Sequence, residues 1–262
     1  MPCSPLSLWH RTWTGDSWYH WSWKVQNCSI CGGRNYVRDK VLVTQLIADW
    51  QLSHAEATYI DDQQGCHCIA CGANLRVVAL GVAVAAAFGI RVPLRDLVQR
   101  HEAERFRLLD INGAVAISLT LAALPGYVRC GFPAVDIHHL PYQNASFDIV
   151  IHSDTLEHVS QPVRALEECR RVLVPGVRLC FTVPTIVGRL TRNRGLPKSY
   201  HGDPSVKLDD YLVYTEFGAD VWCYVMQAGF THLAINQVAY PAATAISAWC
   251  EQGFLGGGDN VA

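Results

Sequence analysis

The sequence predicts an α/β fold with a doubly wound, mainly parallel sheet, preceded by a small metal-binding module. Two observations lead to this prediction. From residue 105 onward, short runs with strand composition alternate with helical runs, which is typical of parallel strands joined by helices. Ahead of that region lie two Cys-x-x-Cys turns, each followed by glycine, and this spacing suits one tetrahedral metal ion.

Length and composition limit the possible functions. With 262 residues the chain has room for one α/β domain of ordinary size and a small accessory unit. Half of the residues are hydrophobic, 17% are charged and the formal net charge is −2. The chain therefore has no global positive charge to attract a polyanion, and we expect no nucleic-acid partner.

Composition divides the chain into five segments. They are a Trp-rich arm (1–26), a cysteine-bounded metal module (27–76), a helical connector (77–104), the α/β domain (105–250) and a flexible tail (251–262). The arm carries five tryptophans in fifteen positions. We expect these rings to pack on the body of the protein or on a second subunit in a homodimer, and the alternative is an aromatic platform for a sugar or another flat ligand.

No segment has the pattern of a secretory signal or a membrane span. The N-terminus lacks a basic region followed by an apolar run. The longest apolar stretch, Val77 to Ile90, is shorter than the roughly 20 residues that span a bilayer, so it predicts a buried helix. Eleven cysteines, an odd number, favour metal binding in a reducing cytoplasm over a disulfide framework.

The predicted metal site is a structural zinc bound by Cys28, Cys31, Cys68 and Cys71. Two residues between thiolates, with a glycine beyond, allow both sulfurs of a pair to reach one ion, and four thiolates leave no open position for catalysis. The 36-residue spacer between the pairs is long, and Cys66 and His67 are rival ligands. Free buried thiols, or metal binding by one pair alone, are the alternatives.

Between the cysteine pairs the sequence predicts two short helices. Residues 41–52 place apolar side chains near helical spacing. Ser53 with Glu56 three residues later has the pattern of a capping box that opens the next helix.

In the α/β domain the predicted strands and helices follow one another along the chain. The runs are 106–111 (strand), 114–124 (helix), 147–153 (strand), 163–173 (helix), 177–184 (strand), 216–230 (helix) and 233–240 (strand). Ligands of such sheets bind at the carboxyl ends of the strands.

The first of these strand ends carries a candidate binding turn. Asp110, Asn112 and Gly113 form an acidic strand end followed by a small-residue turn into a helix, where backbone N–H groups can face a ligand. A dinucleotide-binding fingerprint has three glycines and this turn has one, so close approach of a pyrophosphate is not predicted.

A second motif is more specific. Residues 135–159 read VDIHHLPYQNASFDIVIHSDTLEHV, and residues 170–179 read RRVLVPGVRL. This combination resembles the class I S-adenosylmethionine-dependent methyltransferases of type 11. With the cysteine spacing and the runs 181–195, 199–204 and 215–222, the region from about 27 to 250 is similar to a bacterial subgroup that carries an N-terminal zinc knuckle.

The resemblance implies a Rossmann-like methyltransferase domain that binds S-adenosylmethionine. Asp136 and the backbone amide of Ile137 are expected to receive the adenine. His152, Ser153 and Asp154, at the end of the strand before LEHV, are expected near the cofactor. Asp110, Asn112 and Gly113 complete the predicted cofactor site.

Histidines are the leading candidates for a catalytic base, and either His152, at the strand end, or His158 is expected to face the cleft. His158 opens a helix just beyond a strand end, where general-base and capping roles are both reasonable. His201 and Glu216 lie in or beyond the loops expected over the sheet edge, and a solvated role is their alternative. Arg189, Arg192 and Arg194 form a basic loop that favours solvent exposure over binding of an anionic acceptor.

The function predicted from these residues is methyl transfer from S-adenosylmethionine to a hydroxyl of a small molecule or glycan. A catalytically inactive scaffold of the same fold is the first alternative, because the glycine motif is reduced. A zinc-knuckle interaction module is the second, and the few basic residues near the cysteines disfavour it.

Overall fold

The computed structural model describes residues 27–196, 199 and 212–251. The predicted Trp-rich arm, the tail beyond residue 251 and the candidate base His201 lie outside the described residues.

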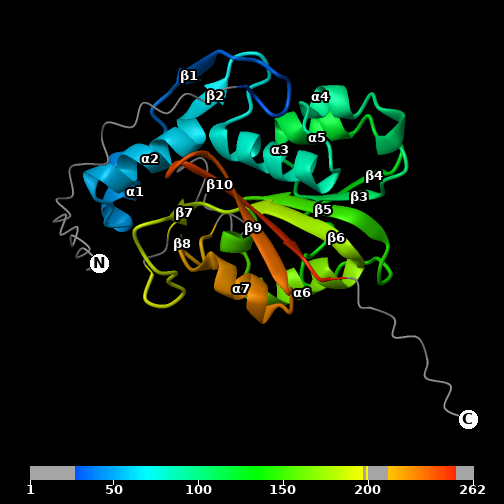
Figure 1. Cartoon of the computed structure of the whole chain (residues 1–262). Coiled ribbons are helices and arrows are strands. Elements are labelled where there is room, and N and C mark those ends of the chain that lie inside the picture. Colours follow the sequence, from blue (N-terminus) through cyan, green and yellow to red (C-terminus); the bar gives the residue numbers. More distant parts are fainter. Residues whose placement is uncertain (1–26, 197–198, 200–211, 252–262) are drawn as a thin grey trace, which may run out of the picture.

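The elements follow the chain in the order that Figure 1 shows. The strands are β1 (Tyr36–Arg38), β2 (Cys66–Cys68), β3 (Leu108–Ile111), β4 (Tyr127–Cys130), β5 (Phe147–Ser153), β6 (Leu173–Thr182), β7 (Thr185–Ile186), β8 (Phe217–Gly218), β9 (His232–Ala239) and β10 (Ala243–Trp249). The α-helices are α1 (Thr44–Asp49), α2 (His54–Gly65), α3 (Leu75–Ala87), α4 (Leu94–Leu97), α5 (Val115–Leu121), α6 (Pro162–Val172) and α7 (Val221–Gln227), and short 3-10 turns lie at His101–Ala103 and Leu156–His158.

The central sheet confirms the predicted fold class. Its strand order is β4-β3-β5-β6-β10-β9. The strands from β4 to β6 run parallel, whereas β10 pairs antiparallel with both β6 and β9. The order reverses beside β3, and this reversal creates the crevice in which such sheets bind ligands.

Two strands of this sheet were missed by the sequence prediction. The edge strand β4 has a half-buried or exposed side chain at each of its positions, so its sequence shows little hydrophobic alternation. Strand β10 (ATAISAW) is rich in small residues, whose pattern predicts neither a helix nor a strand. Their places were decided by pairing with neighbouring strands.

Helices cover both faces of the sheet (Figure 1). On one face, α3 contacts β5, β6, β9 and β10, and α4 and α5 pack beside it. On the other face, α6 packs against β6 and α7 against β9. Each face has its own buried cluster, one centred on α3 and the other on α6 and α7.

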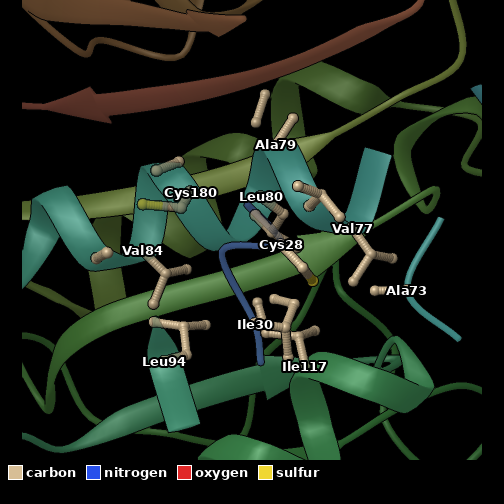
Figure 2. Close-up of a cluster of buried hydrophobic side chains, with 14 of the residues drawn as sticks. Cys28, Ile30, Ala73, Val77, Ala79, Leu80, Val84, Leu94, Ile117 and Cys180 are labelled. Carbon is tan, nitrogen blue, oxygen red and sulfur yellow. The ribbon is translucent and has the colours of Figure 1, made fainter. Parts of the chain in front are cut away.

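Helix α3 forms a layer of the sheet domain and also contacts the cysteine module. It begins at Leu75, two residues before the segment predicted as a helical connector, and is apolar on nearly all sides, with ten of its residues buried. Figure 2 shows Cys28 and Ile30 among side chains of α3 such as Leu80 and Val84, in one continuous cluster. The cysteine module and the sheet therefore share a hydrophobic core.

Within the module, the two predicted helices and the capping box are confirmed. Helices α1 and α2 lie between the cysteine pairs. The Ser53 hydroxyl accepts a hydrogen bond from the Glu56 amide, and the Glu56 carboxylate accepts one from the Ser53 amide. Strands β1 and β2 pair antiparallel and bring the two cysteine turns together. None of the described helices is long and apolar enough to cross a membrane.

Candidate active site and metal site

The four predicted zinc ligands meet in one cluster. The sulfurs of Cys28, Cys31, Cys68 and Cys71 all lie within 4.8 Å of one another. The Sγ–Sγ distances are 3.6 Å for Cys28 and Cys71 and 3.7 Å for Cys31 and Cys68. A tetrahedron with zinc–sulfur bonds near 2.3 Å has edges of about 3.8 Å, so the four thiols fit a zinc ion.

The rival ligands Cys66 and His67 are not part of this cluster. Cys66 is buried on the same strand as Cys68, but its sulfur lies outside the cluster. His67 Nδ1 lies 3.1 Å from the Gly65 carbonyl oxygen. The structure therefore groups the four cysteines that the spacing predicted.

A cleft of about 730 Å³ opens at the carboxyl ends of the parallel strands. Its walls come from the loops after β3, β4 and β5 and from the segment before β8. The lining residues are Asn112, Phe132, Pro133, Val135, Asp136, Ile137, His138, Asp154, Thr155, His158, Val159, Ser160 and Tyr214. The volume lies within the range of small-molecule sites, and the position is the one expected for this sheet.

Asn112 joins three loops at the floor of this cleft. Its φ of 64° and that of Gly113, 70°, turn the chain sharply after β3. The Asn112 side chain donates to the Thr155 hydroxyl over 3.2 Å and accepts from the Phe132 amide over 2.9 Å. In the predicted small-residue turn, the Asn112 side chain therefore connects the loop after β3 to the loops after β4 and β5 through hydrogen bonds.

The structure does not bring Asp110 into the cleft. Its side chain is buried and accepts hydrogen bonds from the hydroxyls of Ser118 (2.6 Å) and Tyr127 (2.7 Å). Burial raises its pKa, against the effect of these bonds. The Ser118 hydroxyl also accepts from the Ala114 amide, so Asp110 anchors the start of α5 from behind the turn.

Asp136 lies in the cleft beside a histidine that the sequence prediction did not select. The Asp136 Oδ1 accepts from the His138 amide over 2.9 Å and lies 2.7 Å from His138 Nδ1. Partial burial favours a higher pKa for Asp136, but these contacts with His138 outweigh it and lower the pKa. His138 Nε2 is buried and has no hydrogen-bond partner within the described part of the chain. The bond from the His138 amide is an Asx-turn, which Asp136 favours, but nothing in the local sequence identified the ring contact.

His152, predicted near the cofactor, lies inside the sheet. Its ring is fully buried and stacks on Phe181 with centroids 4.9 Å apart. Neither ring nitrogen has a hydrogen-bond partner among residues 27–196, 199 and 212–251. Burial lowers the pKa of His152 to about 3, so the ring is neutral at physiological pH.

We expect the His152→Leu variant to resist acid better than the wild type. Below about pH 6.5 the unfolded chain binds a proton at His152 that the folded chain does not, so stability falls as pH drops towards 3. Between these pH values, His152 lowers the free energy of unfolding by about 1.4 kcal/mol per pH unit. The His152→Leu variant lacks this loss. Thermal unfolding between pH 7.5 and pH 4 measures it, with His101→Leu, at a side chain 94% exposed, as control. Equal acid sensitivity of wild type and His152→Leu would contradict the prediction.

Asp154 and Ser153 have different environments at the end of β5. Asp154 lines the cleft with a φ of 49°, and its amide donates to the Thr182 carbonyl. Ser153 is buried, with its hydroxyl 2.8 Å from that of Thr182. The Asp154 carboxylate lies 3.0 Å from the buried guanidinium of Arg76.

His158 is the predicted base that does line the cleft. Its Nδ1 lies 3.1 Å from the Leu212 carbonyl oxygen, which only accepts, so Nδ1 carries the proton and Nε2 holds the lone pair of the neutral ring. Nε2 is 3.6 Å from a carboxylate oxygen of Glu157. Burial, and then the charge of Asp154, raise the pKa of Glu157.

Glu216 lies outside the cleft and is held by two arginines of the predicted basic loop. Its carboxylate accepts from Arg192 at 2.8 Å and 3.0 Å and lies 3.7 Å from Arg189. Arg189 also binds the Glu56 carboxylate and the carbonyls of Trp50 and Gln51. These contacts tie the cysteine module to the segment before β8, and the geometry gives no support to a catalytic Glu216.

Several cleft residues were not predicted from the sequence, namely Phe132, Pro133, Val135, His138, Thr155, Val159, Ser160 and Tyr214. The loop that carries some of them is clamped by Arg171. Its guanidinium donates to the carbonyls of Leu140 and Tyr142 and pairs with Glu168 at 2.8 Å. The Arg-Arg pair in the 170–179 motif was the available signal for this clamp. The carbonyls that Arg171 contacts lie about thirty positions away, so the sequence did not reveal them.

Comparison with known proteins gives partial matches. Residues 88–181 match the family model described as a methyltransferase domain. A probable S-adenosylmethionine-dependent methyltransferase of Mycolicibacterium smegmatis is 39% identical over 67 residues, 24% of this chain and 26% of that protein. The ubiquinone biosynthesis O-methyltransferase of Roseobacter denitrificans is 28% identical over 106 residues, 35% of this chain and 43% of that protein.

This chain spans less than half the length of the curated relatives that it matches, with shares between 14% and 43%. A solved structure, PigF with SAH, is 17% identical, with 66% of this chain and 59% of that chain covered and a TM-score of 0.38. The sequence match coincides with β3, β4, β5 and most of β6, which form the parallel part of the sheet beside the cleft. The central part of this chain, residues 88–181, is therefore similar to the methyltransferase domain family.

Proposed function

We propose that the chain is an S-adenosylmethionine-dependent methyltransferase that methylates a hydroxyl of a small molecule or glycan. The observation that carries this proposal is the cleft. It collects Asn112, Asp136, Ile137, Asp154 and His158 at the carboxyl edge of a sheet whose central strands match the family.

Polar groups in the cleft support the binding of such a cofactor. Asp136 and the neighbouring Ile137, which the motif predicts to receive the adenine, both line the cleft. His138 also lines the cleft, and its buried Nε2 has no hydrogen-bond partner among the residues that the structure describes. When bound, S-adenosylmethionine supplies a methyl group on a sulfonium.

His158 is the proposed base for a hydroxyl acceptor. Nε2 of His158 would accept the hydroxyl proton of the acceptor, and bound S-adenosylmethionine would supply the methyl group. The Leu212 carbonyl keeps the ring in the tautomer that can accept it. Two aromatic side chains that line the cleft, Phe132 (61% exposed) and Tyr214 (41% exposed), offer faces for a flat or sugar-like acceptor.

The cysteine cluster is proposed to hold a structural zinc ion. Four thiolates at tetrahedral spacing leave no position for a substrate, so the ion would stabilise the fold. The cytoplasmic location and the lack of a nucleic-acid partner remain predictions from composition. The homodimer contact through residues 1–26 also remains a prediction.

Calorimetry with S-adenosylhomocysteine tests the proposed function. We expect the wild type to bind, and Asp136→Asn to bind about tenfold more weakly because a charged hydrogen-bond acceptor is lost. Asp148→Asn is the control, since Asp148 pairs with Arg107 at the opposite end of β5 and should leave binding unchanged. If the wild type does not bind at near-millimolar ligand, the proposed function is wrong and the chain is a catalytically inactive scaffold with this fold. Transfer of labelled methyl groups to a panel of phenolic and sugar hydroxyls then identifies the acceptor.

A further inference from the structure

Arg76 is a buried cation that connects the cysteine module to the cleft. It is the second residue of α3, and only 4% of it is exposed. Its Nη2 lies 3.0 Å from Oδ2 of Asp154, which lines the cleft. Its Nε and Nη1 are buried and have no hydrogen-bond partner in the described part of the chain. A buried guanidinium is costly unless it is paired, so the Asp154 carboxylate is held tightly to it.

Asp154 needs such a restraint because its backbone conformation is unusual. A φ of 49° is in the left-handed region, which residues other than glycine adopt at a cost. The Asp154 amide donates to the Thr182 carbonyl over 3.0 Å. The Asp154 side chain is held by the Arg76 pair at 3.0 Å and accepts a longer hydrogen bond, 3.4 Å, from the Thr182 hydroxyl. These three contacts fix the turn from β5 towards Thr155 and His158 in the cleft wall.

The second cysteine turn places Arg76 directly. Cys71 and Arg76 are five positions apart. The amide of Cys68 donates to the Ala73 carbonyl over 2.9 Å, and Asn74 caps α3 by accepting from the Val77 amide over 3.0 Å. The start of α3 is therefore built onto the metal-binding turn.

The first cysteine turn holds α3 from the side. The Ser29 hydroxyl donates to the Val78 carbonyl, and the Ser29 and Ile30 carbonyls accept from the amides that begin α4. Gly81 of α3 leaves no room for a Cβ, because Ser29 and Ile30 occupy that space. The second turn thus fixes the position of α3 along the helix axis, and the first turn fixes its sideways position. Helix α3 carries Arg76.

We propose that Arg76 is a positioning residue through which the four-cysteine cluster sets the geometry of the cleft wall at Asp154. The ion would hold both turns, the turns hold α3, and Arg76 transmits that position to Asp154. The cofactor-binding readout of this inference rests on the proposed function, whereas its structural readout does not.

Hydrogen exchange of the zinc-loaded full chain provides the structural test. In Arg76→Met we expect exchange in residues 153–158 to rise about fivefold, with about one equivalent of zinc retained. Arg95→Met is the matched control, because the Arg95 side chain is exposed and, among the described residues, forms a surface pair with Asp96, and it should leave exchange unchanged. Unchanged exchange in 153–158 of Arg76→Met would overturn the proposal.

A ligand variant tests the link to the metal. Cys71→Ser removes one ligand, and we expect faster exchange in 153–158 as well as in the two cysteine turns. A change confined to the turns would overturn the link. If Cys71→Ser fails to fold, Gly81→Ala replaces it, since it keeps all four cysteines and displaces the first turn from α3.

A double-mutant cycle provides the binding test. Arg76→Met and Asp154→Asn are each expected to weaken S-adenosylhomocysteine binding about tenfold, and the double variant no more than either alone, because both remove one interaction. Additive losses, or wild-type affinity in Arg76→Met, would contradict the positioning role. If the wild type itself does not bind, the proposed function fails, and the exchange experiment still decides whether Arg76 couples the module to the cleft wall.

Discussion

Replacing Cys68 with serine is expected to release the zinc ion and to lower the stability of the whole chain by about 3 kcal/mol or more. Structural zinc sites contribute about 10–16 kcal/mol of apparent binding energy in small zinc domains, and binding requires the folded arrangement of all ligands. Because the cysteine turns share a buried cluster with α3 and the sheet, the loss is not confined to the module. At about 2–4 °C per kcal/mol for a chain of this size, the midpoint of thermal unfolding should fall by roughly 10 °C.

Cys66→Ser is the matched control. Cys66 and Cys68 lie two positions apart on β2, and both are buried, with 2% and 0% exposed. Only Cys68 belongs to the sulfur cluster. Elemental analysis should find about one equivalent of zinc in wild type and Cys66→Ser and less than half an equivalent in Cys68→Ser. Equal zinc contents in the two variants, or none in the wild type, would refute the assignment of the ligands.

Replacing His158 with glutamine is expected to lower kcat by a factor of about 10² to 10⁴. This is the usual contribution of a general base, and His158 is the predicted base that lines the cleft. Glutamine is close in size and polar, so the affinity for S-adenosylhomocysteine should stay within about twofold of the wild type. The rate of methyl transfer to the acceptor found in the hydroxyl panel, together with calorimetry, measures both quantities.

The pH dependence separates a base from a residue that only shapes the cleft. A base must be unprotonated to act, so the wild-type rate falls towards acid pH, and His158→Gln should lack this acid limb. His101→Gln is the control, because His101 is 94% exposed and is not among the residues that line the cleft. If His158→Gln keeps more than about one tenth of the wild-type kcat, another group removes the proton.

Features that depend on a few neighbouring residues were predictable. The capping box of Ser53 and Glu56 is a hydrogen-bond pattern within one helical turn, and it forms as predicted. The Cys-x-x-Cys turns likewise bring each pair of sulfurs together through local backbone geometry. The alternation of strands and helices beyond residue 105 gave the mainly parallel sheet, although β4 and β10 escaped notice.

The direction in which a side chain points was harder to predict. Asp110 and His152 both lie at strand ends, where polar residues commonly face a ligand, yet both are buried. Strands covered by helices on both faces have apolar residues at nearly every position, so the sequence does not tell which alternate set turns towards the cleft. Tertiary contacts decide these two directions. His152 stacks on Phe181, and Asp110 accepts hydrogen bonds from Ser118 and Tyr127.

The sequence by itself determined the fold class, the two Cys-x-x-Cys turns and the strand edge at which the cleft opens. Only the tertiary structure decided that Cys66 stays outside the cluster, that His158 but not His152 lines the cleft, and that Arg76 reaches Asp154. The physical reason is separation along the chain. Short-range hydrogen bonds and turn geometry depend on adjacent residues. In contrast, the pair of Arg76 and Asp154, 78 positions apart, forms only when α3 and β5 pack together.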